Sequence, residues 1–260
     1  MNLRPKQSLG QNFLRDPNII RKILESLRAP SDAHVVEIGP GEGALTEPLS
    51  SKYPRFTAIE IDERAVRHLR ERLPDADIRQ QDILQVDWRT LADETAAPLY
   101  VIGNLPYNIT SQILISLLDA RHVIEEAVLM MQKEVAERLV AEPRTKAYGI
   151  LSVQTQVFAD AELMFTVSPK VFFPRPDVMS AVVRLTFPRE KAEPSGRDAA
   201  FFRDVVRAAF NQRRKTLRNS LRAWTRERGI ELPGGLAERR AEELSPAEFV
   251  GLAHYLGARR

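Results

Sequence analysis

The feature that most constrains the fold is a regular alternation of short apolar segments with amphipathic segments between residues 34 and 140. The apolar segments predict strands at 34–38, 56–61, 76–81, 99–103 and 126–132. Apolar residues at helical spacing predict helices at about 44–52, 63–72, 109–118 and 133–140. Parallel strands need crossover connections, which are usually helices. The alternation therefore predicts an α/β fold with a doubly wound, mostly parallel sheet.

Flanking segments extend this scheme at both ends. The first dozen residues read as a mobile basic lead-in, after which Asp16 and Pro17 predict the start of a helix that ends near Pro30. Two further strands, 162–168 and 180–187, are joined by a proline-rich connection. We therefore expect the sheet to finish with an antiparallel hairpin.

A polar segment with proline and glycine, 188–198, predicts a linker between two domains, 1–188 and 189–260. The second domain reads as entirely helical, because its apolar residues recur at helical spacing. They form two stripes: Phe202, Val205, Val206, Ala209 and Phe210, then Leu217, Leu221 and Trp224.

Composition excludes several classes of protein. The 260 residues are 43% hydrophobic and 28% charged, as in ordinary globular proteins rather than disordered ones. No apolar run approaches the roughly 20 residues that cross a bilayer, and the N-terminus has no recognisable secretory signal. The absence of cysteine excludes disulfides and thiol catalysis and fits a cytoplasmic location. The four histidines are scattered without a metal-binding spacing, so no metal is expected.

Positive charge is concentrated toward the C-terminus. The whole chain has a formal net charge of +3, but residues 197–228 carry +7 and the remainder carries −4. Arg214, Arg218, Arg222 and Arg226 recur every fourth residue and would share one face of a helix. Such a stripe is often only solvated, but its contrast with the acidic remainder favours a polyanionic partner.

A glycine-rich turn, GPGEG, follows the first strand and places Gly39, Gly41 and Gly43 before a helix. Glycines there let a ligand approach the backbone and the helix N-terminus closely. The spacing is GxGxG rather than the GxGxxG of a pyrophosphate binder. The turn therefore favours a cofactor without phosphates and disfavours a nicotinamide oxidoreductase.

Acidic side chains end the next two strands. Glu60 can accept hydrogen bonds from both hydroxyls of a ribose, and Asp82 can accept one from the amine of an adenine. Taken singly, each acid is more often a solvated strand end. Together, after the glycine-rich turn, they predict a nucleoside pocket at one edge of the sheet.

The fourth strand ends in GNLPYN, which is the most specific element of the chain. Asn104 offers a side-chain carbonyl, Leu105 a main-chain carbonyl fixed by Pro106, and Tyr107 an aromatic face. Such a set can hold a planar amino group with two acceptors and stack its ring. The alternative is a proline turn with a core tyrosine.

The order of these motifs resembles the S-adenosylmethionine-dependent ribosomal RNA adenine N6-dimethyltransferases, and among them the bacterial small-subunit branch (KsgA/RsmA type). The matching segments cover nearly the whole chain: 11–14, 37–46, 59–62, 80–82, 104–108, 132–139, 147–153, 172–180 and 210–221. The resemblance implies a Rossmann-like class I methyltransferase fold, with a seven-stranded sheet ending in an antiparallel hairpin and a small all-helical C-terminal domain. It also implies dimethylation of two adjacent adenosines near the 3′ end of small-subunit (16S) rRNA in an assembling particle, by a monomer.

The same resemblance implies roles for individual residues. S-adenosylmethionine would contact Gln11, Asn12, Leu14, Gly39, Gly41, Glu60, Ile61, Asp82, Ile83 and Asn104. The target base would meet Asn104, Leu105, Pro106 and Tyr107, with Phe172 as a second aromatic wall opposite Tyr107. RNA phosphates would contact Arg213, Arg214, Lys215, Arg218 and Arg222.

Two alternatives remain besides the small-subunit enzyme. One is a resistance-type methyltransferase acting on large-subunit (23S) rRNA, which shares several motifs; segments 132–139, 146–153 and 210–221 favour the small-subunit branch. The other is a ribosome-assembly or transcription factor that kept the fold and lost the chemistry. Intact Glu60, Asp82 and NLPYN argue against it.

Overall fold

The computed structural model describes residues 3–6, 9–189, 199–212 and 214–258. The chain divides into two compact units, 1–136 with 161–188, and 137–160 with 189–260. Residues 137–160 were expected in the first domain, but they group with the C-terminal helices. The ring of Phe158, for example, packs against the ring of Phe202. The domain division 1–188 and 189–260 stays a prediction, and residues 190–198 of the expected linker lie outside the described residues.

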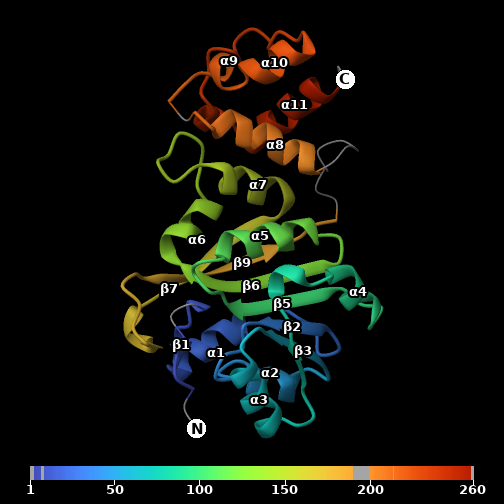
Figure 1. Ribbon diagram of the computed structural model, residues 1–260, viewed down its shortest axis with the longest axis vertical. Coiled ribbons are helices and arrows are strands. Elements are labelled where there is room, and N and C mark those ends of the chain that lie inside the picture. The colour runs from blue at the N-terminus through green and yellow to red at the C-terminus, as the bar shows by residue number, and fades with distance from the viewer. Residues whose placement is uncertain (1–2, 7–8, 190–198, 213, 259–260) are drawn as a thin grey trace. The chain divides into compact units, whose positions relative to one another are not determined.

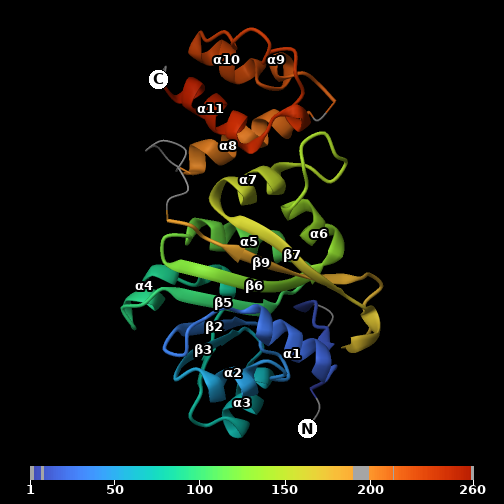
Figure 2. The same cartoon turned by 180° about the vertical axis from the view of Figure 1, so that it is seen from behind.

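Unit 1 is built on a seven-stranded sheet in the order β4-β3-β2-β5-β6-β9-β7 (Figures 1 and 2). The strands are β2 (His34–Ile38), β3 (Arg55–Glu60), β4 (Asp77–Gln80), β5 (Leu99–Asn104), β6 (Ile124–Gln132), β7 (Asp160–Val167) and β9 (Ser180–Thr186). The five neighbouring strands β4, β3, β2, β5 and β6 run parallel to one another, and β9 pairs antiparallel with β6. This confirms the predicted Rossmann-like methyltransferase fold with its antiparallel end.

Three of the α-helices of unit 1 begin at aspartate caps. Asp16, Asp62 and Asp87 each accept hydrogen bonds from main-chain N–H groups in the first turn of the helix that follows. The helical segments are α1 (Pro17–Ser26), α2 (Thr46–Lys52), α3 (Glu63–Arg72), η2 (Ile83–Gln85), α4 (Trp88–Asp93), α5 (Thr110–Asp119), α6 (Lys133–Leu139) and η3 (Pro169–Val171). The cap at Asp16 was predicted, whereas α4 was not.

The central strands carry the core. Every residue of β2 is buried, including the polar His34 and Glu37, as is typical of a central strand that is covered on both faces. A buried arginine, Arg184 on β9, ion-pairs with Glu162 on β7 and donates to the carbonyl oxygen of Ser26 at the end of α1. This charge is therefore satisfied inside the unit.

A short strand that the sequence did not predict follows the first dozen residues. Phe13 and Leu14 form a short strand, β1, paired antiparallel with β8 (Phe172–Phe173). Both residues of β1 are buried. Two hydrophobic side chains bury enough apolar surface to fix this segment, although its sequence is mostly polar.

Unit 2 is helical among its described residues. It contains α7 (Ile150–Phe158), α8 (Ala199–Phe210), α9 (Leu217–Ser220), α10 (Arg222–Arg228), η4 (Ala241–Glu243) and α11 (Pro246–Gly257). The predicted α8 stripe is confirmed, since the five residues named for it are the buried ones. Phe210 stacks on Phe249, and the Tyr148 hydroxyl donates to the carbonyl oxygen of Leu244.

The predicted arginine stripe is wrong as one helical face. Arg214 precedes α9, and Leu221 separates α9 from α10, so the four-residue recurrence does not run along one continuous helix. Arg218 ion-pairs with Glu238 on the surface. Leu217 and Leu221 are buried. The packing of these apolar side chains, and not the spacing of the arginines, determines how the chain runs here.

Candidate active site

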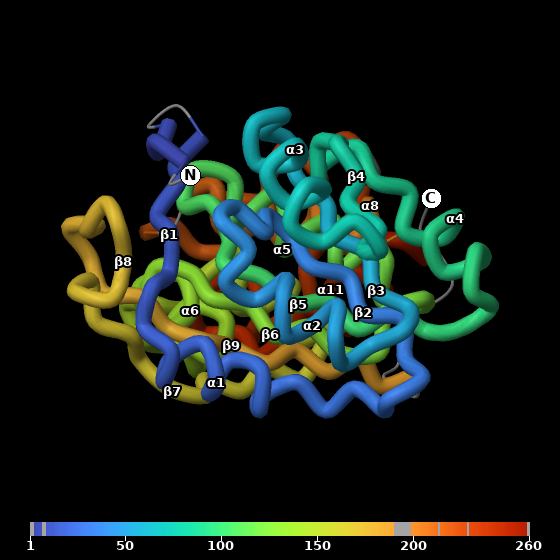
Figure 3. Tube along the Cα trace, turned by 90° about the horizontal axis from the view of Figure 1, so that it is seen from below, coloured from blue at the N-terminus to red at the C-terminus, as the bar shows by residue number. Residues whose placement is uncertain are grey.

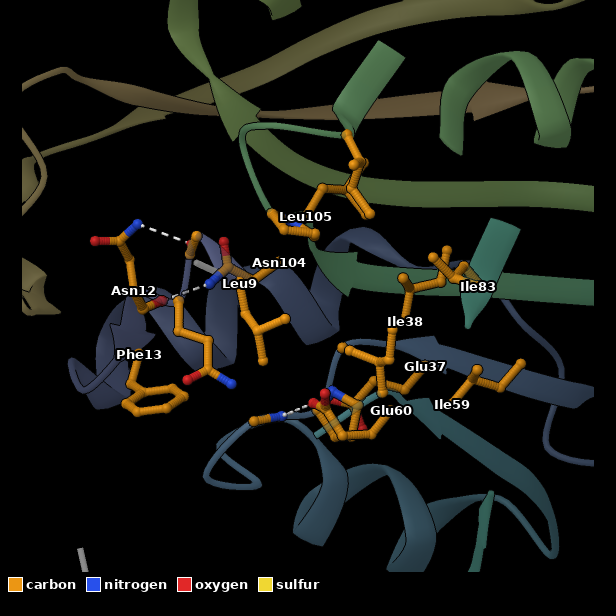
Figure 4. A pocket seen from close by; sticks show the side chains of 18 of the residues that line it. Leu9, Asn12, Phe13, Glu37, Ile38, Ile59, Glu60, Ile83, Asn104 and Leu105 are labelled. Atoms are coloured by element: carbon orange, nitrogen blue, oxygen red, sulfur yellow. Dashed lines mark hydrogen bonds between the residues drawn. The ribbon is translucent and has the colours of Figure 1, made fainter. Parts of the chain in front are cut away.

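A single pocket of unit 1 collects every residue that the sequence assigned to a cofactor. It opens at the carboxyl ends of β2, β3 and β5, where doubly wound sheets bind ligands, and it contains about 990 Å³ of empty space, including space open to solvent. The lining includes Gln11, Asn12, Leu14, Gly39, Gly41, Glu60, Ile61, Asp82, Ile83 and Asn104. Figure 4 shows Asn12 and Asn104 on one side of this pocket and Glu37 and Glu60 on another. The space suits a nucleoside-sized ligand.

The glycine-rich turn lines the pocket next to the end of β2. Gly39 and Gly41 have φ values of +64° and +57°, a left-handed conformation that favours glycine. A Cβ atom on Gly41 would lie 3.0 Å from the ring of Phe13. The turn therefore fits against β1 only because this position lacks a side chain.

Glu60 closes β3 and organises the turn. Its carboxylate accepts hydrogen bonds from the N–H of Gly41 (3.1 Å) and the N–H of Asp62 (2.9 Å). Burial raises the pKa of this carboxyl, and the main-chain N–H groups work against that rise. Two oxygens offer about four acceptor positions, so Glu60 can still accept from the hydroxyls of a ribose.

Asp82 follows β4 at the same edge of the sheet. Its carboxylate accepts from the N–H of Leu84 at 2.9 Å and caps η2, which fixes the direction of the side chain. Beside it, Ile83 is buried, and on the β3 side Ile61 is 51% exposed. These residues give a polar acceptor flanked by apolar walls, as a purine ring requires.

The N-terminal segment is tied to the pocket by Asp62, a residue that sequence reasoning did not single out. Its carboxylate accepts hydrogen bonds from Gln11 (3.1 Å), Lys6 (3.4 Å) and Arg64. The bonds from Arg64 hold the pKa of Asp62 well below its ordinary value. The only sequence signal was its place in the IEID motif.

Asn104 is oriented by the same segment. Its amide nitrogen donates to the main-chain carbonyl oxygen of Asn12 over 2.9 Å, drawn as a dashed line in Figure 4. Only the nitrogen of the amide can face a carbonyl oxygen, so the oxygen of Asn104 is left as an acceptor. The predicted acceptor at this position is therefore available.

The rest of the NLPY motif is equally constrained. Leu105 is buried, and its N–H donates to the carbonyl oxygen of Met130 at 2.9 Å. Pro106 and Tyr107 line the pocket, and the Tyr107 hydroxyl lies 2.8 Å from the Ser180 hydroxyl. Burial raises the pKa of Tyr107, which keeps its hydroxyl neutral. Ser180 is a contact that the sequence reasoning missed.

Phe172 is 5% exposed and packs in the hydrophobic core with Leu14. Its role as a second aromatic wall opposite Tyr107 stays a prediction. Successive residues of a strand point to opposite faces, so Phe172 packs inward and Phe173 is 48% exposed.

Glu37 is a buried acid in the pocket wall that was not predicted as a site residue. It is 2% exposed, and its Oε2 atom has no hydrogen-bond partner among the described residues. Burial raises its pKa to about 8, and the nearby Glu60 adds to that rise. Its position in the strand motif VVEIG gave no signal that separated it from the core.

The predicted RNA-contacting residues lie in unit 2. Arg214, Lys215, Arg218 and Arg222 are exposed, and Arg213 lies outside the described residues. Their contact with RNA stays a prediction. Elsewhere, His34 is buried between the hydroxyls of Thr57 (2.9 Å) and Thr95 (3.1 Å), which is a structural position.

No group of three or more His, Asp or Glu residues that could hold a metal ion occurs in 3–6, 9–189, 199–212 and 214–258. Over those same ranges, none of the helices has the length and apolar character needed to cross a membrane.

Comparison with known proteins agrees with the geometry. Residues 2–257 match the family model described as ribosomal RNA adenine dimethylase. A protein from Salinibacter ruber named ribosomal RNA small subunit methyltransferase A is 58% identical over 255 residues, covering 98% of this chain and 86% of that protein.

Two solved structures are similar. A dimethyladenosine transferase from Plasmodium falciparum matches with a TM-score of 0.76 at 23% identity, covering 92% of this chain and 95% of that one. The 23S rRNA methyltransferase ErmE matches with a TM-score of 0.68 at 28% identity, covering 95% and 100%. Because the family model spans nearly the whole sequence, the chain belongs to the ribosomal RNA adenine dimethylase family.

Proposed function

We propose that this enzyme transfers methyl groups from S-adenosylmethionine to N6 of two adjacent adenosines near the 3′ end of small-subunit rRNA, giving N6,N6-dimethyladenosine. The supporting observation is that Glu60, Asp82 and Asn104 line one pocket at the carboxyl ends of the strands. The substrate would be an assembling small-subunit particle in the cytoplasm, and the enzyme would act as a monomer.

The cofactor would be bound by hydrogen-bond acceptors and by the shape of the pocket. Glu60 and Asp82 are spaced along the sheet edge so that one can accept from a ribose and the other from an adenine amine. S-adenosylmethionine supplies a methyl group that its sulfonium charge activates for transfer. The buried turn at Gly39 and Gly41 would exclude water from this side of the pocket.

The NLPY loop prepares the nucleophile. The side-chain oxygen of Asn104 and the main-chain oxygen of Leu105 would accept hydrogen bonds from the N6 amine of the target adenine. Two acceptors draw the nitrogen lone pair out of conjugation with the ring and make it more nucleophilic. The ring of Tyr107, held through Ser180, would stack on the base that is flipped out of its helix.

No general base is needed in this scheme. Once alkylated, the target nitrogen would carry a positive charge, and its acidic proton would pass to water. Asn104 can orient the amine but cannot take a proton. The enzyme therefore lowers the barrier mainly by positioning and by aimed acceptors.

Two alternatives are less well supported. A large-subunit enzyme would be expected to resemble ErmE more than the small-subunit relatives, but identity is 28% to ErmE and 58% to the Salinibacter protein. A factor that lost the chemistry would have no reason to keep Asn104 oriented in a lined pocket.

The experiment is a methyl-transfer assay on separated ribosomal particles. Small and large particles from a strain lacking the modification are incubated with the enzyme and methyl-labelled S-adenosylmethionine. Label in small-subunit rRNA alone supports the proposal. Label in large-subunit rRNA would indicate the resistance type, and no label in either would indicate a non-catalytic factor.

A further inference from the structure

The described residues expose few large hydrophobic side chains, and three of them lie in one short segment that runs from the end of β8 to the start of β9. Phe173, Val178 and Met179 are 48%, 43% and 40% exposed. The segment from Phe173 to Met179 also contains Pro174 and Pro176, which reduce its freedom to rearrange. An apolar stretch of this kind on the surface marks a binding surface more often than chance.

Both ends of the segment from Phe173 to Met179 are attached to residues of the pocket. At one end, Phe173 pairs with Phe13, which lines the pocket, and Figure 3 shows β8 beside β1. At the other end, Ser180 holds the hydroxyl of Tyr107. The exposed segment therefore borders the pocket from the N-terminal strand to the NLPY loop.

A cation lies on the aromatic ring of this segment. The guanidinium carbon of Arg15 is 4.3 Å from the ring centroid of Phe173, and Arg15 is exposed. Arg15 is also 3.4 Å from Glu42, and the segment itself carries one base, Arg175, and one acid, Asp177. A guanidinium stacked on a phenyl ring is itself planar, and its outer face can stack on a nucleobase.

We propose that Phe173, with Arg15 on its ring, binds an unpaired nucleobase of the RNA next to the adenosine that enters the pocket. The inference rests on the proposed function. Flipping a base out of its helix leaves its neighbours without a stacking partner, and exposed aromatic rings accept such bases regardless of sequence. Val178 and Met179 extend the apolar surface beside the ring.

The test uses three substitutions of Phe173 and steady-state methylation of small-subunit particles. Stacking of a base on an aromatic ring is worth enough to predict a rise of about fivefold or more in the KM for particles in Phe173→Ala. Phe173→Leu should show a similar rise because leucine has no aromatic face, and Phe173→Tyr should stay within about twofold. The affinity for S-adenosylmethionine and the melting temperature should not change.

A matched pair of arginine variants tests whether Arg15 contributes to particle binding. Arg15→Gln should raise the KM for particles, whereas Arg21→Gln, an equally charged change on the exposed face of α1, should not. If Arg15→Gln leaves the KM unchanged, the stacked cation has no part in binding.

Other outcomes separate the possible failures. An unchanged KM in Phe173→Ala, with active wild-type enzyme, would overturn this inference and leave the proposed function intact. A raised KM in Phe173→Ala that Phe173→Leu restores would indicate contact with an apolar protein surface, and would also overturn it. Absence of methylation by the wild-type enzyme would instead overturn the proposed function.

Discussion

The side-chain amide of Asn104 donates to the main-chain carbonyl oxygen of Asn12, a residue 92 positions earlier in the chain. The bond joins the end of β5 to the segment before β1, and it fixes which end of the amide faces the pocket. The NLPY loop is therefore aligned by an N-terminal segment that has little secondary structure of its own.

Asn104→Ala should lower the rate of methyl transfer by at least about tenfold, because loss of one aimed acceptor raises the barrier by more than about 1.4 kcal/mol. The measurement is a single-turnover rate on small-subunit particles at saturating cofactor. Asn108→Ala is a matched control, since Asn108 belongs to the same motif but is exposed and outside the pocket lining. A near-normal rate in Asn104→Ala would remove this residue from the mechanism.

Glu60→Gln should weaken S-adenosylmethionine binding by roughly tenfold or more, because a charge-assisted hydrogen bond is worth about 1.5–3 kcal/mol. The two oxygens of Glu60 accept from different main-chain N–H groups, so glutamine keeps only one of these two bonds, and a melting curve of the variant must show that the fold is retained. Asp82→Asn should act in the same direction. Calorimetric titration measures both, with Glu63→Gln on the exposed face of α3 as the control. Parent affinity in both variants would mean that the nucleoside pocket lies elsewhere.

Glu37→Gln should make the stability of unit 1 less sensitive to pH. The folded-state pKa of Glu37 is about 8, above its unfolded value of 4.5, so the folded state holds the proton more tightly. This group therefore stabilises the fold most below pH 4.5, and that contribution is lost as the pH rises to about 8. The melting temperature of Glu37→Gln minus that of the parent should increase from pH 5 to pH 8. A constant difference would show that Glu37 does not titrate in this range.

The basic residues of unit 2 should govern the salt dependence of particle binding. Replacing Arg214, Arg218 and Arg222 by Gln should weaken binding and flatten its salt dependence by a slope of about 0.7 to 0.9 per lost phosphate contact. Arg218 should contribute least, because Glu238 already pairs with it. Filter binding over a salt series, with a melting curve for each variant, is the measurement. A parent slope in the triple variant would mean that these charges serve solubility only.

The strands and most helices of unit 1 could be predicted because each is specified locally. Strand β2 and helix α3 have the predicted bounds, since an apolar run and the Asp62 cap define them within a few residues. The cofactor acids could be found in the same way, because the ends of parallel strands meet at one edge of a sheet.

What could not be predicted depends on contacts between distant segments. The N-terminal residues are ordered by Asp62 and by pairing of β1 with β8, which local composition does not encode. Phe172 and Phe173 are the same residue type side by side, and only the register of β8 decides which one is buried. The arginine recurrence did not predict a single helical face, because α9 and α10 are separate helices that meet at Leu221.

The central claim is tested most directly by identifying the methylated nucleosides and their position. Small-subunit rRNA methylated to completion by the wild-type enzyme is digested, and its fragments are sequenced by mass spectrometry. The account predicts two adjacent N6,N6-dimethyladenosines near the 3′ end of the small-subunit rRNA, and at most about a tenth as much of them after a single-turnover incubation of equal length with Asn104→Ala. Monomethylated adenosine as the end product, or dimethyladenosine at any other position, would contradict it.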